Sequence, residues 1–237
     1  MQLNKFVTLL SISFFSLPIS ALECQWWQTK VKAHAVQKHQ REGNTVSKHP
    51  RQEHCREKWK GADIYIKQFK NVPIEGWPHK ETFKTWTGPE IETLLKVFAS
   101  APDWAGLSNY EFYRALKSDV VSNPARSEIT YKSIILYDSF FSRNDKLTII
   151  VHESAHHLYR SLGPAGINEF TNLSGWQLET NQKRQVFERP PERLIKPDSA
   201  ISKEEDFANH LEEFYRSSNS YQKSNPTLYK FMNGRFK

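Results

Sequence analysis

The sequence predicts an α+β protein built from a small basic module followed by a larger domain. Two segments, residues 147–162 and 202–215, carry apolar side chains at helical spacing. A third segment, residues 133–137, is rich in β-branched and aromatic side chains and is typical of a strand. The stretch 31–59 is dense in His, Lys and Arg and differs in composition from the rest of the chain. We therefore expect the strand and the two helices in one domain and the basic stretch in a separate module.

Residues 1–21 have the composition of a secretory signal peptide. A basic start with Lys5 precedes an apolar run over residues 6–17, which is too short to span a bilayer comfortably. Ala21 supplies the small residue typical of a signal-peptidase cleavage site. We expect a secreted or periplasmic protein, with an uncleaved anchor as the alternative. No second long apolar run follows, so the mature chain is expected to lack a membrane span.

Residues 22–75 are assigned to the basic module, which contains both cysteines of the chain. An oxidising compartment favours a disulfide between Cys24 and Cys55. In the chain-entropy model such a bond contributes roughly 3 to 4 kcal/mol to stability. Neither cysteine has the short paired spacing of a zinc knuckle, so both are given a structural role, with unpaired thiols as the alternative.

A short sequence repeats within this module. Residues 36–41 read VQKHQR and residues 46–51 read VSKHPR. Residues 42–45 between the copies favour a turn, so the copies are expected to pair as short strands. The formal net charge of +7 favours acidic partners. Residues 31–59 could bind an anionic cell-envelope polymer or a partner protein, form a propeptide-like cover, or be solvated surface; export argues against nucleic acid.

Residues 76–89 are predicted to be a linker, because this stretch contains Trp-Pro and Gly-Pro dipeptides. The larger domain is expected to span residues 90–237 and to begin with a helix over residues 90–100, where apolar side chains recur at helical spacing. The strand at 133–137 is expected to form a sheet edge packed on the helix that follows it.

His152, Glu153 and His156 form an H-E-x-x-H pattern inside the predicted helix 147–162. Positions four apart lie on one helix face, so both imidazoles can reach one metal ion, and Zn²⁺ is the expected cofactor. Glu153 lies beside the first ligand, where its carboxylate can accept a proton from an attacking water. The pattern predicts metal-assisted hydrolysis, most often of a peptide bond. The alternative is a core helix whose histidines only form hydrogen bonds.

A catalytic zinc site normally takes three protein ligands, so the rest of the chain must supply one. A third histidine in the extended form of the pattern is excluded by Leu162, and a glutamate twenty residues after the pattern is excluded by Trp176. The best candidate is Glu205, at the start of the second predicted helix. The alternative is local, because Ser202 and Glu205 fit a Ser-x-x-Glu capping box that needs no metal. Other carboxylates are held in reserve, namely Glu204, Asp206 and Glu179.

With residues 152–156 followed by Glu205, Ala208 and Asn209, the chain resembles the gluzincin metallopeptidases, whose second helix carries Glu-x-x-Ala and then an acidic or amide residue. The stretches 174–176 and 226–231 look like the catalytic domain of the anthrax-lethal-factor-like group. The resemblance covers roughly residues 90–237.

The resemblance implies a zincin-like metallopeptidase domain in which Glu205 is a zinc ligand and the small Ala208 lets two helices approach closely. It also implies that Asn209, at a position where the family often has an acid, orients a zinc histidine by accepting its other N–H. A tyrosine often stabilises the developing oxyanion in such sites, and Tyr215 and Tyr229 are the candidates.

We therefore expect an exported zinc metallopeptidase that acts on a protein or peptide substrate, with Glu153 as general base. The strand at 133–137 would hold an extended substrate by backbone pairing. Two alternatives stay open. One is a cell-envelope binding or structural protein with a weak or inactive zinc site, and the other is a peptidoglycan amidase that uses the same chemistry on a different amide.

Overall fold

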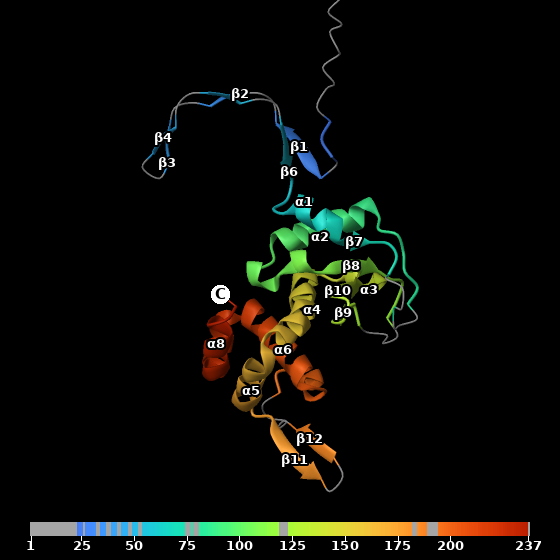
Figure 1. Ribbon diagram of the computed structural model, residues 1–237, viewed down its shortest axis with the longest axis vertical. Helices are drawn as coiled ribbons and strands as arrows, with labels where there is room; N and C mark the ends of the chain where they lie inside the picture. The colour runs from blue at the N-terminus through green and yellow to red at the C-terminus, as the bar shows by residue number, and fades with distance from the viewer. Residues whose placement is uncertain are drawn as a thin grey trace, which may run out of the picture. The chain divides into compact units, whose positions relative to one another are not determined.

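The computed structural model describes residues 23–25, 27–31, 34–36, 39–41, 44–46, 49–51, 54–73, 77, 81–118, 123–181, 184–188 and 194–236 (Figure 1). The predicted signal peptide lies outside the described residues. Contacts divide the chain into a first unit that ends at Arg56 and a second unit that begins at Glu57. The fold is mixed α and β with small sheets, as the sequence predicts.

The first unit is a series of paired strands: β1 (Gln28–Val31) with β6 (His54–Glu57), β2 (His34–Val36) with β5 (His49–Arg51), and β3 (His39–Arg41) with β4 (Asn44–Val46). The inner pairs are antiparallel, with Val36 opposite His49 and His39 opposite Val46. Residues of the two copies therefore pair with each other as short strands, as predicted. The predicted turn at 42–45 is shorter than expected, because residues 44 and 45 belong to β4, and residues 42–43 lie outside the described residues. The predicted disulfide is also confirmed, because Cys24 and Cys55 are bonded.

The second unit contains most of the regular structure. Its elements are α1 (Ala62–Tyr65), η1 (Ile66–Gln68), β7 (Phe69–Lys70), α2 (Gly88–Ala99), η2 (Asp103–Ala105), η3 (Leu107–Asn109), β8 (Glu111–Arg114), β9 (Ala125–Glu128), β10 (Ser133–Leu136), α3 (Asp138–Ser142), α4 (Lys146–Ser161), α5 (Gly163–Ser174), β11 (Gln177–Asn181), β12 (Arg184–Glu188), η5 (Pro197–Ala200), α6 (Lys203–Arg216), α7 (Ser218–Ser224) and α8 (Pro226–Asn233). Among the described residues, no helix combines the length and the apolar character needed to cross a membrane.

The central sheet has the strand order β7-β8-β10-β9. Strand β10 is the predicted strand, and it runs parallel to β8 and antiparallel to β9. The expectation that residues 133–137 form a sheet edge is therefore wrong. Because β10 is paired on both sides, its backbone cannot hold an extended substrate either. All four side chains of β10 are buried, as is typical of a strand covered on both sides. The edge strands among the described residues are β7 and β9, and the polar sequence Ala-Arg-Ser-Glu of β9 gave no strand signal.

The second unit begins well before the predicted start of the larger domain at residue 90. Strand β7 pairs in parallel with β8, and Phe83 forms an antiparallel bridge with Ala115. Segments assigned to the basic module and to the linker thus contribute backbone pairing to the sheet. The helix predicted at 90–100 is α2, whose first turn is fixed by a capping box between Thr87 and Glu90.

Helix α4 connects two hydrophobic clusters. Its first half packs with the sheet and α2 through Ile149 and Ile150. Its second half packs with α5, α6 and α8, and here Ala155 and Ala208 are fully buried. Figure 1 shows α4 running from the sheet towards α6, with which it makes extensive contact. This packing holds the face of α4 that carries His152 and His156 against the start of α6.

Candidate metal centre

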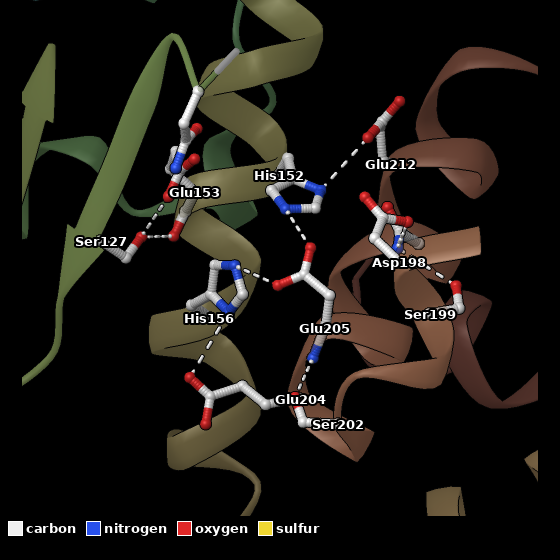
Figure 2. A network of polar contacts seen from close by, with 12 residues as sticks. Ser127, His152, Glu153, His156, Asp198, Ser199, Ser202, Glu204, Glu205 and Glu212 are labelled. Atoms are coloured by element: carbon white, nitrogen blue, oxygen red, sulfur yellow. Dashed lines mark hydrogen bonds and ion pairs between the residues drawn. The ribbon is translucent and has the colours of Figure 1, made fainter. Parts of the chain in front are cut away.

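Two helices supply the residues of the candidate site. His152 and His156 lie one turn apart on α4, and Glu205 lies in the first turn of α6 (Figure 2). Figure 2 shows both imidazole rings turned towards the carboxylate of Glu205. The structure therefore brings together the three residues that the sequence predicts as ligands.

The distances between these groups suit a metal ion. His152 Nε2 lies 3.1 Å from Glu205 Oε1, and His156 Nε2 lies 3.5 Å from Glu205 Oε2. Three ligand atoms, one from each residue, lie within 4.8 Å of one another. Ligand atoms about 2.1 Å from a tetrahedral ion would lie about 3.4 Å apart. Among the described residues, this is the group of His, Cys, Asp and Glu side chains that could hold a metal ion.

The sequence left two roles open for Glu205, metal ligand or partner of the Ser202 cap, and the structure is compatible with both. Ser202 Oγ accepts a hydrogen bond of 3.0 Å from Glu205 N, so Ser202 does cap α6. The Glu205 carboxylate, however, points away from the cap and contacts the two histidines. Capping by Ser202 and metal binding by Glu205 are therefore compatible.

The second nitrogen of each histidine also faces a carboxylate. His152 Nδ1 lies 3.2 Å from Glu212 Oε2, and His156 Nδ1 lies 3.4 Å from Glu204 Oε1. Such partners fix the tautomer of a metal-binding imidazole, leaving Nε2 free to bind the ion. Each carboxylate is itself paired with a cation, as the ion pairs Lys196–Glu212 at 2.5 Å and Arg160–Glu204 at 2.7 Å show.

The role of Glu212 was not predicted, although the sequence carries a signal for it. Glu212 lies seven residues after Glu205, and two turns along a helix bring side chains to the same face. The sequence gives a weaker indication that Glu204 lies near the histidines, because Glu204 and Glu205 are adjacent on a helix and their side chains point about 100° apart.

The expected role of Asn209 is wrong. Asn209 is fully buried, and its Nδ2 donates to Asp198 Oδ1 at 2.9 Å and to Ser199 Oγ at 3.1 Å. Its Oδ1, the atom expected to accept from a histidine, has no hydrogen-bond partner among the described residues. Asn209 instead holds η5 against α6, and the carboxylates of Glu204 and Glu212 occupy the places beside the histidines.

The electrostatics of the site favour a positive charge at its centre. Burial alone would lower the pKa of His152, but hydrogen bonds to Glu205 and Glu212 and the nearby charge of Glu153 outweigh it and raise the pKa to about 10. Burial acts to raise the pKa of Glu205, yet the contacts with His152 and His156 hold it below its usual value. Without an ion, a proton on His152 supplies the positive charge that the carboxylates stabilise.

Glu153 lies on a different side of α4 from the two histidines. Glu153 is only 6% exposed to solvent. Ser127 Oγ on β9 lies 2.9 Å from Glu153 Oε2 and 2.5 Å from the main-chain oxygen of Glu153. Figure 2 shows the Glu153 side chain turned towards β9, whereas the imidazoles point towards α6. The contact with Ser127 could not be found from the sequence, because it depends on the register of β9.

The structure gives no support to the predicted oxyanion donors. Tyr215 lies against Trp104 and Tyr229 against Phe214, and neither tyrosine is among the described residues that line the cleft of the site. Two further histidines near the predicted ligands also have other partners. His157 stacks on Tyr110, and His210 Nδ1 lies 2.7 Å from Tyr221 Oη.

The candidate ligands open onto a cleft of about 750 Å³. One wall is formed by residues 123–127, which include the start of the edge strand β9, and another by the first turns of α4. The third wall comes from η5 and the start of α6, including Lys196 and Ile201. A cleft of this size can admit a segment of polypeptide or a ligand of similar width.

The same cleft is thus lined by three residues that could hold a metal ion and by the buried carboxylate of Glu153. No protein-family model matches the chain, and comparisons with curated proteins and with solved structures found no significant match. The resemblance to gluzincins therefore stays a prediction that rests on the residues alone.

Proposed function

We propose that this protein is an exported zinc metallopeptidase with a zincin-like catalytic domain. The observation that carries the proposal is the convergence of His152, His156 and Glu205 on one point, with Glu153 beside them in the same cleft. Catalytic zinc sites commonly combine three protein ligands with a carboxylate base, whereas a site that only stabilised the fold would have no use for such a base beside its ligands.

The donor set supports zinc as the ion. Two imidazole nitrogens and one carboxylate oxygen are the ligands of many catalytic zinc sites. Harder ions such as Mg²⁺ and Ca²⁺ prefer oxygen ligands, whereas two of the three ligand atoms here are imidazole nitrogens. When bound, zinc would make a water more acidic and polarise a substrate carbonyl.

The protein residues then have distinct roles. Glu153 accepts a proton from the water that attacks the scissile carbonyl, and it passes that proton to the amine that leaves. Glu212 and Glu204 hold His152 and His156 in the tautomer that presents Nε2 to the ion. The cleft is lined by Glu153 and by the three candidate ligands, so a peptide bound in it would lie beside Glu153.

Export is supported by the disulfide between Cys24 and Cys55, since such bonds persist mainly in oxidising compartments. Together with the signal-like residues 1–21, it favours a secreted or periplasmic location. The binding of an anionic cell-envelope polymer by residues 31–59 is a separate prediction. To test it, the full chain and a variant whose lysines and arginines in that stretch are neutralised are compared for retention on isolated cell-wall material. Equal retention of the two proteins would reject polymer binding by this stretch.

Zinc content and hydrolysis, measured on wild type and Glu153→Gln, test the proposed function. Wild type is expected to bind one zinc per chain and to cleave members of a mixed peptide library, whereas Glu153→Gln keeps the zinc and loses cleavage. Glu213→Gln is the matched control, because Glu213 lies on α6 and pairs with the exposed Arg216. Cleavage of purified peptidoglycan fragments without cleavage of peptides would favour an amidase instead.

A further inference from the structure

Ser127 makes a two-point contact with Glu153. Its hydroxyl lies within hydrogen-bond distance of the carboxylate oxygen Oε2 and of the main-chain oxygen of the same residue. A serine hydroxyl has one hydrogen to donate, so it donates to one of these two acceptors at a time. The carboxylate is largely buried, and a donor to a buried carboxylate contributes more than one in water.

The position of Ser127 follows from the pleat of β9. Ala125 belongs to the hydrophobic cluster that contains Ile149 and Ile150 of α4, and residues two apart on a strand share a face. Ser127 therefore faces α4, whereas Arg126 faces the other side of the sheet and pairs with Glu81. The register Ser127 opposite Ile134 fixes this orientation.

We propose that Ser127 is a positioning residue that holds the Glu153 carboxylate in the orientation required for proton transfer. The proposal rests on the proposed function, in which Glu153 is the base. Proton transfer requires a base within hydrogen-bond reach of the attacking water, and a glutamate side chain has three rotatable bonds that must be fixed. The hydroxyl of Ser127 fixes the end of that side chain from the edge strand β9.

A purely structural role would have a different consequence. If Ser127 only tied β9 to α4 through the Glu153 main-chain oxygen, its loss would lower the thermal stability without a selective effect on turnover. If Ser127 orients the carboxylate, its loss lowers kcat while KM, zinc content and folding stay close to those of wild type.

The kinetic experiment compares zinc-loaded wild type, Ser127→Ala, Ser127→Thr and Ser133→Ala on one quenched fluorescent peptide selected from the library. Ser133 is the matched control, because it is a buried serine on the adjacent strand β10 whose hydroxyl has no hydrogen-bond partner among the described residues. Ser127→Ala is expected to lower kcat about tenfold with KM within about twofold, and Ser127→Thr to restore most of the loss. A kcat for Ser127→Ala within twofold of the Ser133→Ala value overturns the proposal.

Crystal structures of the zinc-loaded wild type and Ser127→Ala make the result independent of activity. If wild type cleaves nothing, the proposed function fails, and the structures alone decide the role of Ser127. Wild type is expected to show one Glu153 rotamer in contact with Ser127 Oγ, and Ser127→Ala to show a displaced or multiple rotamer. An unchanged Glu153 side chain in Ser127→Ala overturns the proposal. Ser127→Cys replaces Ser127→Ala, under the same criteria, if the alanine variant does not fold.

Discussion

Glu212 Oε2 lies 3.2 Å from His152 Nδ1, on the opposite side of the imidazole ring from Glu205. Both carboxylates come from α6, two turns apart, so one helix supplies a candidate metal ligand and the group that orients another candidate ligand. The pairing of Glu204 with His156 Nδ1 repeats the arrangement at the second histidine. The packing of α6 on α4 therefore sets both the ligands and their tautomers.

Replacing Glu212 by alanine is expected to weaken zinc binding about 10–100-fold, because His152 loses the acceptor that fixes its ring and tautomer. A competition titration against a zinc chelator of known affinity measures the change. Glu213→Ala is the control, since Glu213 follows Glu212 on α6 and pairs with Arg216 rather than with a histidine. Equal zinc affinity in the two variants would show that Glu212 does not support the site.

Zinc binding is expected to release about one proton per chain at pH 7.5. The carboxylates beside His152 raise its pKa to about 10 in the metal-free protein, so the ring is protonated at that pH and must lose its proton to bind the ion. Zinc affinity should therefore rise as the pH rises from about 6.5 towards 10. Calorimetry in two buffers with different ionisation enthalpies measures the proton release, and a binding enthalpy independent of the buffer would contradict it.

The fold class and the three ligand candidates could be predicted because they depend on local patterns. Helical spacing located α4 and α6, and the i, i+4 histidines fixed one half of the centre. The disulfide could be predicted because the chain has only two cysteines, and the paired strands of the first unit because the repeat is visible in the sequence.

The contacts around the ligands could not be predicted, because they depend on how distant segments pack. Ser127 comes from an edge strand whose polar sequence has no strand signal, and its register decides that it faces α4. Asn209 has the spacing of an orienting residue, but η5 packs against it and takes its hydrogen bonds. A one-dimensional spacing cannot reveal which of several polar side chains on a helix face meets a given partner.

His157 is expected to make the metal-free protein sensitive to acid. Burial lowers its pKa to about 4, although its Nε2 lies 3.2 Å from the carbonyl of Ser133. Between pH 6.5 and 5 the unfolded chain takes up a proton that the folded chain does not, so stability falls with the pH by about 1.5 kcal/mol from this residue. Urea unfolding of wild type and His157→Gln at both pH values checks this. Wild type should lose more stability than the variant, and equal losses would contradict the assignment.

Reduction of the disulfide is expected to loosen the first unit without affecting the metal centre. Cys24 and Cys55 are 31 residues apart, and closing a loop of that length stabilises by about 4 kcal/mol in the chain-entropy model. Faster hydrogen exchange in β1 and β6 after reduction and alkylation would report the loosening. Zinc affinity should not change, because all three ligand candidates belong to the second unit; a loss of zinc on reduction would contradict this separation.

The most direct test of the central claim is the zinc stoichiometry of purified wild type, Glu205→Ala and Glu153→Gln, measured together with peptide hydrolysis. We predict one zinc per chain with cleavage for wild type, loss of zinc for Glu205→Ala, and one zinc without cleavage for Glu153→Gln. Full zinc retention by Glu205→Ala, or unchanged cleavage by Glu153→Gln, would contradict the assignment of these two residues.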